Sequence, residues 1–351
     1  MKNFHIPEKR RYKADFSQLL NILSKKPADR PVLFEFFMNP IVYKAFTESL
    51  TIGSAPSEDL HDRLEMMWAF HQAGYDYVTM LPPKSFTFQE QAENHSLTLT
   101  YSLNKQGLIS DEVSFASFNW PDPKSQSYEY LDFIAAHLPD NMSMIAAGPG
   151  GLEENVIALT GYEQLCYMMI DEPDLVTAIF SEVGNRLVEY YQITAAHPNV
   201  GACISNDDWG FNTQTLLTLE QMERWIFPWH QKIADTIHAA GKPAILHSCG
   251  NIYPIMDQIA HTIQYDGKHS YEDTILPVEE AWETYHNDIA IMGGIDLNYL
   301  IFESEENVYK RSKSMLERTS ALGGFALGSG NSIPDYVPLE KYITMLKSAW
   351  E

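Results

Sequence analysis

The sequence predicts an α/β protein: a single (β/α)8 TIM barrel over residues 1–351, with an N-terminal helical extension and an insertion after the second strand. Two observations predict this class. Eight short apolar runs alternate with longer amphipathic stretches, and no linker, repeat or low-complexity tract divides the chain. Strands that alternate with helices indicate a parallel sheet, and eight of them favour a barrel over an open sheet.

The eight predicted strands are short, and most are continuously apolar, as expected for a sheet that helices cover. They are Val32–Phe36, Tyr77–Met80, Ser143–Ala147, Gly201–Ser205, Ala244–His247, Thr262–Gly267, Ile289–Ile295 and Gly324–Leu327.

Helices are predicted between these strands by apolar residues at helical spacing and by capping signals. Asp15–Ser24 forms the N-terminal extension, and Glu58–Ala73 is an amphipathic helix. Thr160 and Thr218 are each followed three residues later by Glu or Gln, the pattern of a capping box. The helix after Thr218 is expected to continue to Gly241.

The segment from Lys84 to Pro121 is rich in Thr, Ser and Asn and contains alternating Leu and Thr. Alternation of apolar and polar residues is typical of strands. We therefore expect a hairpin-bearing insertion after the second strand.

The charge balance excludes several classes of partner. The chain has 24 basic and 47 acidic residues, a formal net charge of −23. This acidity argues against binding to nucleic-acid phosphates and against docking on anionic membranes. No apolar run approaches the roughly 20 residues of a membrane span, and the polar N-terminus predicts no signal peptide. The odd, sparse cysteines Cys166, Cys203 and Cys249 indicate the reducing cytoplasm rather than a disulfide scaffold.

Polar residues stand where nearly every predicted strand ends. In a barrel of this class the chemistry lies at the carboxyl ends of the strands, so these residues are the candidate site. They are Glu35, Asp207, Asp208, Trp209, His247, Cys249, His269, Asp296 and Asn331.

His247 and Cys249 are the sharpest pair among them. Residues i and i+2 of a strand point to the same side, so an imidazole and a thiolate could reach one ion. This combination suits zinc. The alternative is a core histidine beside a small buried thiol.

The other polar residues allow functional and structural interpretations. Asp207 and Asp208 are adjacent and should face opposite ways, so one enters the mouth as a metal ligand or proton carrier and the other caps the next helix or is solvated. Together with His269 they are the expected catalytic residues, although the pattern favours a structural or supporting histidine at His269 over a metal ligand. Glu35, Trp209, Asp296 and Asn331 are the expected substrate-binding residues.

Five segments in this order resemble the uroporphyrinogen decarboxylase superfamily. They are Arg30–Glu35, Asp207–Gly210, Gly241–Asn251, Gly293–Asp296 and Gly323–Pro334. The resemblance implies a (β/α)8 barrel and one of two chemistries. One is the decarboxylation of porphyrinogen acetate arms without a cofactor. The other is methyl transfer to or from a corrinoid carried by a partner protein, usually with zinc.

The residues are closer to the corrinoid-dependent zinc methyltransferases. A porphyrinogen carries eight carboxylates and calls for arginine partners, whereas no arginine lies between Arg63 and Arg186. The His-x-Cys motif of the methyltransferases is present as His247 and Cys249. The resemblance therefore implies zinc as cofactor, a corrinoid protein as partner and a small-molecule methyl donor.

One departure from that branch concerns the metal. Asn331 stands where those methyltransferases supply a later cysteine, so another ligand must complete the site or the zinc is lost. The residues that could replace it are Glu35, Asp207, Asp208, His269 and Glu272. An acidic ligand makes the site harder, which favours demethylation of a donor over activation of an acceptor thiol. The alternatives are a uroporphyrinogen decarboxylase and a non-catalytic ligand-binding barrel.

Overall fold

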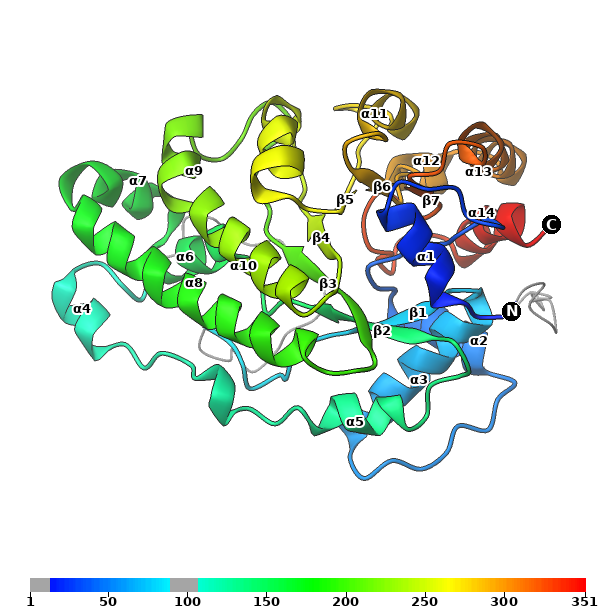
Figure 1. The fold of residues 1–351 in the computed structure, drawn as a ribbon, viewed down its shortest axis with the longest axis horizontal. Helices are drawn as coiled ribbons and strands as arrows, with labels where there is room; N and C mark the ends of the chain where they lie inside the picture. The colour runs from blue at the N-terminus through cyan, green and yellow to red at the C-terminus, as the bar shows by residue number, and fades with distance from the viewer. Residues whose placement is uncertain (1–12, 89–106) are drawn as a thin grey trace.

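A computed structural model of the chain describes residues 13–88 and 107–351 (Figure 1). It confirms an α/β fold built on one parallel sheet, whose strands are neighbours in chain order. The strands are β1 (Tyr77–Met80), β2 (Ser143–Ala147), β3 (Val200–Asn206), β4 (Ala244–His247), β5 (Gly267–His269), β6 (Ala290–Met292) and β7 (Phe325–Ala326). Because all six pairings are parallel, every connection must cross back over the sheet.

The first predicted strand differs from the structure. Within Val32–Phe36 only Leu33 forms a bridge, with Leu327 beyond β7. The hydroxyl of Tyr77 in β1 bonds both the backbone N–H and the C=O of Glu35, at 2.7 and 2.6 Å. The N–H of Glu35 is therefore not free to pair with a neighbouring strand. Among the described residues the sheet has seven strands, and a complete (β/α)8 barrel is not confirmed.

Three other predicted strands are shorter in the structure. The expected strand Thr262–Gly267 is wrong over most of its length, because Gln258–Ile263 is a π-helix and β5 begins at Gly267. The strand predicted over Ile289–Ile295 shortens to β6. Gly293 and Gly294 after it have φ angles of +75° and +122°, outside the extended region. The last predicted strand, Gly324–Leu327, shortens to β7.

The helices lie between the strands and before and after the sheet (Figure 1). In order they are α1 (Phe16–Leu23), α2 (Pro40–Thr47), α3 (Glu58–Ala73), α4 (Glu112–Ser117), α5 (Glu129–Ala135), α6 (Leu152–Thr160), α7 (Tyr162–Asp171), α8 (Pro173–Ala195), α9 (Leu219–Trp225), α10 (Phe227–Ala239), α11 (Val278–Tyr285), α12 (Leu297–Phe302), α13 (Glu305–Thr319) and α14 (Leu339–Trp350). The long helix α8 packs beside α10. None of the described helices has the length and apolar character needed to cross a membrane.

The helix predictions are mostly confirmed. α1 and α3 have the expected positions, and Thr218 forms a capping box with Gln221. The predicted helix after Thr218 is divided at Ile226, where Pro228 in the first turn of α10 lacks the N–H that a continuous helix needs. The capping box at Thr160 is wrong. This residue ends α6, and its hydroxyl donates to the C=O of Val156 instead.

The predicted insertion after Met80 is only partly described. Its described portion contains the short helix α4, capped by Asp111. The alternating Leu and Thr residues, on which the expected hairpin rested, lie outside the described residues.

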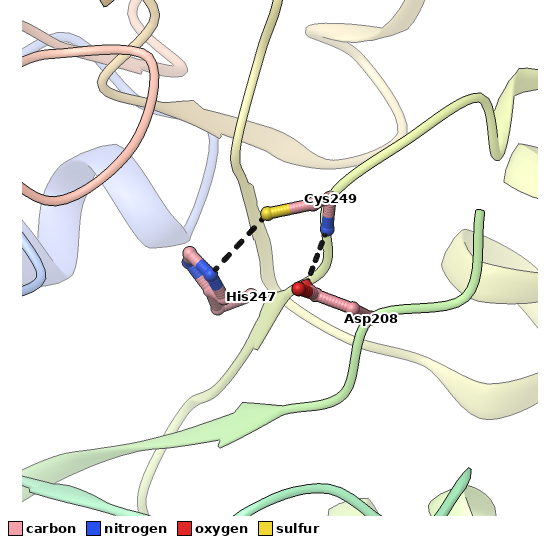
Figure 2. Close-up of side chains that lie close together, drawn as sticks. All are labelled: Asp208, His247 and Cys249. Carbon is pink, nitrogen blue, oxygen red and sulfur yellow. Dashed lines mark hydrogen bonds between the residues drawn. The ribbon is translucent and has the colours of Figure 1, made fainter. Parts of the chain in front are cut away.

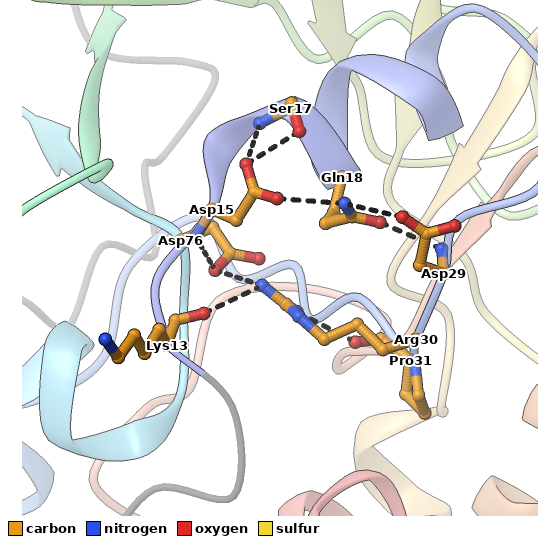
Figure 3. A network of polar contacts seen from close by, with 8 residues as sticks. All are labelled: Lys13, Asp15, Ser17, Gln18, Asp29, Arg30, Pro31 and Asp76. Atoms are coloured by element: carbon orange, nitrogen blue, oxygen red, sulfur yellow. Dashed lines mark hydrogen bonds and ion pairs between the residues drawn. The ribbon is translucent and has the colours of Figure 1, made fainter.

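Helix α1 covers the amino-terminal ends of the strands. The ring of Phe16 packs directly against Gly201 in β3. A polar network ties this helix to the sheet (Figure 3). Arg30 forms an ion pair with Asp76 at 2.6 Å, and Asp76 also accepts the backbone N–H of Asp15 at 2.9 Å. Gln18 bridges the carboxylates of Asp15 and Asp29. We call these five residues, Asp15, Gln18, Asp29, Arg30 and Asp76, the basal network.

Candidate metal centre

Asp208, His247 and Cys249 converge at the carboxyl ends of β3 and β4 (Figure 2). Asn206 of β3 pairs in register with His247 of β4. Asp208 and Cys249, each two residues beyond this pair, are therefore brought side by side. One potential ligand atom from each of the three lies within 4.8 Å of the others. Within residues 13–88 and 107–351, no other group of three or more such side chains is close enough to hold a metal.

His247 presents one ring nitrogen to this group. Its Nε2 lies 3.8 Å from Cys249 Sγ, while its Nδ1 lies 2.8 Å from Nδ1 of His269. Burial lowers the pKa of His247 to about 4. The imidazole is thus neutral at pH 7, as a metal ligand must be.

The thiol of Cys249 is surrounded by hydrogen-bond donors. Ser270 Oγ and Asn331 Nδ2 lie 3.4 and 3.3 Å from Sγ, and the Cys249 N–H donates to Asp208 Oδ1 at 2.8 Å. Burial, and next the charge of Asp208, raise the pKa of the thiol well above its usual value. A metal ion bound here must therefore displace the thiol proton.

Asp207, unlike its neighbour Asp208, lies outside this group of three residues. It is fully buried and accepts the backbone N–H groups of Glu153 and Glu154 at the start of α6, both at 3.0 Å. It also accepts Trp209 Nε1 at 2.8 Å and contacts His230 Nε2 at 2.9 Å. These contacts hold the loop after β3 in place.

Trp209 and Glu35, both predicted to bind substrate, have no exposed surface. The indole of Trp209 is used in the contact with Asp207. The carboxyl group of Glu35 accepts the backbone N–H of Ser329 at 3.3 Å, and one of its oxygens lies 2.7 Å from the Ser329 hydroxyl. Burial raises the pKa of Glu35 to about 8. In this conformation both side chains support the site from behind rather than face a substrate.

The remaining predicted residues, Asp296, Asn331 and His269, are each held by hydrogen bonds. Asp296 caps α12 by accepting the N–H of Tyr299, and it also accepts the N–H of Asp273. Asn331 contacts the thiol, and His269 stands behind His247. Glu272, considered as a replacement ligand, is outside the three-residue group.

Sequence reasoning missed Lys268 and Ser270 in and after β5. Lys268 is buried, its ammonium group donates to the C=O of Ser270, and it lies 4.2 Å from the ring centroid of Tyr271. Burial lowers the pKa of Lys268 to about 8. The available signal was a lysine directly before the predicted site residue His269, at the end of an apolar segment.

The three residues form a donor set that fits zinc. A thiolate, an imidazole and a carboxylate are all common zinc ligands, and three protein ligands leave a fourth position for a substrate or water. The sulfur and nitrogen donors make the set unsuited to magnesium or calcium, which take oxygen ligands.

Comparisons with known proteins agree with this picture of the fold. The family "Uroporphyrinogen decarboxylase (URO-D)" matches residues 111–351. A methyltransferase from Methanosarcina mazei has a similar structure, with a TM-score of 0.72 at 16% identity over 96% of this chain and 98% of the other. A rutinosidase from Aspergillus niger gives a TM-score of only 0.42 at 11% identity, over 94% of this chain and 99% of that one. No curated protein matches the chain.

Proposed function

Because the chain belongs to the uroporphyrinogen decarboxylase family, we propose that it is a methyltransferase that moves a methyl group from a small-molecule donor to the corrinoid of a partner protein, assisted by zinc. The observation that carries this proposal is the convergence of Asp208, His247 and Cys249 at one point of the strand-end edge. Asp208 takes the role of third ligand that Asn331 does not supply.

The balance of the reaction defines what the site must do. The methyl group leaves without its bonding electron pair, the new bond uses a pair from the reduced corrinoid, and the leaving atom takes up one proton. When bound, zinc supplies a Lewis acid that stabilises the charge developing on that leaving atom. This charge develops on the methyl donor, so a hard, electrophilic metal site favours the reaction.

The protein residues favour such a site in two ways. Asp208 contributes an oxygen ligand where a second thiolate would donate more charge. Ser270 and Asn331 both donate hydrogen bonds to Cys249 Sγ, and such bonds withdraw charge from a thiolate and leave the metal more electrophilic. Burial keeps His247 neutral, and its Nδ1 is held by a contact with His269.

The fold supports methyl transfer as the reaction. The structural neighbour from Methanosarcina mazei is a methyltransferase and is similar over nearly the whole length of both chains. The competing chemistry of the family, decarboxylation of a polycarboxylate, is disfavoured by the net charge of −23 and by the absence of arginine from residues 64–185.

A direct assay tests this proposal. Purified protein is analysed for zinc and then incubated with reduced cobalamin and methyl donors of several classes: methyl aryl ethers, methylamines and methyl thioethers. We expect about one zinc per chain and the formation of methylcobalamin with at least one class. His247→Ala and Cys249→Ala should lose both the zinc and the transfer.

Two alternatives are separated by the same preparation. A decarboxylase would remove carboxylates stepwise from uroporphyrinogen without needing metal. A non-catalytic barrel would bind a ligand or partner, form no methylcobalamin and tolerate substitution of His247. Absence of zinc, with full transfer in both alanine variants, would contradict the role of the metal.

A further inference from the structure

We propose that Glu35, Ser329 and His269 are positioning residues that fix the proton of His247 on Nδ1 and direct its Nε2 lone pair to the metal position. Three side chains and both the backbone and the hydroxyl of Ser329 form one buried series of hydrogen bonds, which runs from the segment before β1 to the end of β4. This inference deepens the proposed function and rests on it for the identity of the metal. The arrangement of protons can be tested without metal.

The direction of the chain is set by a backbone carbonyl. His269 Nε2 lies 3.3 Å from the C=O of Ser329. A carbonyl can only accept, so this ring nitrogen must carry a hydrogen. The same carbonyl also accepts the N–H of Gly294 at 2.8 Å, which uses both of its lone pairs. His269 is therefore a donor at Nε2.

Only one placement of hydrogens on the two histidines then remains. Their Nδ1 atoms lie 2.8 Å apart, so one must donate and the other must accept. His269 is fully buried, and its ring makes an edge contact with Phe34 at 5.3 Å between centroids. An imidazolium is unfavourable in such surroundings. A neutral His269 with its hydrogen on Nε2 accepts at Nδ1, and His247 must then be the donor at its own Nδ1.

The consequence falls on the far nitrogen of His247. A neutral imidazole with its hydrogen on Nδ1 has a lone pair on Nε2, and this atom faces Cys249 Sγ at 3.8 Å. Metal-binding histidines commonly have their tautomer set in this way by the partner of the other ring nitrogen. Here the immediate partner is a second histidine, whose own tautomer needs to be fixed by something else.

Glu35 holds the carbonyl that fixes His269. Its carboxyl group contacts both the hydroxyl and the N–H of Ser329. The Ser329 hydroxyl also lies against the C=O of Asn331, and it has one hydrogen for these two contacts. Because the Asn331 carbonyl cannot donate, both contacts are satisfied when Glu35 is protonated and donates to the hydroxyl. Burial of Glu35 supports the neutral form.

Close approach at this point depends on a glycine. A Cβ on Gly293 would lie 2.4 Å from the Ser329 carbonyl oxygen and 3.1 Å from His269 Nε2. Gly293 has a φ of +75°, so its backbone also favours the absence of a side chain. The contact between the Ser329 carbonyl and His269 therefore depends on the absence of a side chain at position 293.

The first experiment measures tautomers in the metal-free protein. Imidazole nitrogen shifts of histidine-labelled protein are recorded by NMR, and the signals of His247 and His269 are assigned by loss in His247→Gln and His269→Phe. We expect His247 protonated at Nδ1 and His269 at Nε2. The reverse arrangement in the wild-type protein would overturn the proposal, whether or not the chain binds zinc or transfers methyl groups.

The second experiment measures zinc affinity by competition with a chelator. Glu35→Ala should leave His247 in a mixture of tautomers and weaken zinc binding about 10-fold or more, as expected for loss of a group behind a metal ligand. Glu35→Gln, which can still donate to the Ser329 hydroxyl and accept its N–H, should restore both readouts.

The matched control is Thr194→Val. It removes a buried hydroxyl that donates to the C=O of Tyr190 within α8. This variant should lose stability while keeping the wild-type tautomers and zinc affinity. If Glu35→Ala also keeps both, Glu35 has no positioning role. If the wild-type tautomers are as expected but no zinc binds, the hydrogen-bonded chain stands and the proposed function fails.

Discussion

The two ends of the strands handle buried polar groups in opposite ways. In the basal network, Arg30 lies against Asp76 at 2.6 Å, a charge satisfied by its opposite (Figure 3). At the carboxyl ends, His247 and Glu35 are buried as neutral groups, because burial lowers the pKa of one and raises that of the other. Paired charges stabilise a fold only while both remain. Buried neutral groups of shifted pKa are typical of functional sites. The ion pair of the basal network therefore serves stability, and the neutral groups at the carboxyl ends serve the site.

The largest expected effect is a loss of zinc affinity at the carboxyl ends of the strands. His247→Ala and Cys249→Ala should each weaken zinc binding by about 1,000-fold or more, roughly 4 kcal/mol, because each removes one of three ligands. Isothermal titration with zinc measures this loss. Cys166→Ala, which removes a thiol in α7, is the control and should bind zinc as the wild type does.

The next effect belongs to the basal network. Arg30→Met should lower the free energy of unfolding by about 3 kcal/mol, because it removes the ion pair that Arg30 forms with the buried carboxylate of Asp76. Urea denaturation measures this change. Zinc affinity should be unchanged, and a parallel loss of zinc would show that the two ends are coupled.

The adjacent residues Asp207 and Asp208 allow a structural role and a metal-binding role to be compared directly. Asp208→Asn should weaken zinc binding roughly 30-fold, about 2 kcal/mol, and change stability little. Asp207→Asn should do the reverse, since Asp207 holds four donors from α6, Trp209 and His230. Equal effects of the two variants on zinc affinity would contradict the assignment of Asp208 alone as ligand.

The dependence of stability on pH below 6.5 should reflect the lowered pKa of His247. Its pKa is about 4 in the folded protein and 6.5 as the ordinary value, so between these values the unfolded chain binds more protons. Stability of the metal-free protein should then fall as the pH falls from 6.5 to 4, by at most about 1.4 kcal/mol per pH unit for this residue. The slope should be smaller in His247→Gln. Urea denaturation at pH 6.5, 5.5 and 4.5 compares them, and identical slopes would contradict a buried neutral His247.

The smallest effect concerns the hydrogen bond to the thiolate. Asn331→Ala removes the donor 3.3 Å from Cys249 Sγ and should weaken zinc binding only about 5-fold, roughly 1 kcal/mol. Spectra of the cobalt-substituted protein should show a shifted sulfur-to-metal charge-transfer band. An unshifted band would indicate that Asn331 does not act on the thiolate.

The sequence predicted most of the sheet, because a buried strand requires continuous apolar residues that can be read directly. It could not predict the loss of the first strand. That depends on the Tyr77 hydroxyl, which reaches across to both backbone groups of Glu35, 42 residues earlier. A contact at such a separation has no local signature.

The metal group was predictable in part for a similar reason. The spacing of His247 and Cys249 placed them on one side of a strand, but the choice between Asp207 and Asp208 needed the register of β3 against β4. Trp209 and Glu35 were expected at the mouth and are buried. Polarity at a strand end shows that a residue has a role, but not which way its side chain points.

Zinc K-edge X-ray absorption of the zinc-loaded protein tests the central claim most directly. The account predicts one sulfur ligand at about 2.3 Å, the remaining ligands being nitrogen and oxygen at about 2.0–2.2 Å. In Cys249→Ala the sulfur contribution should disappear. A protein that binds no zinc, or one whose spectrum is the same in Cys249→Ala, would contradict the site formed by Asp208, His247 and Cys249.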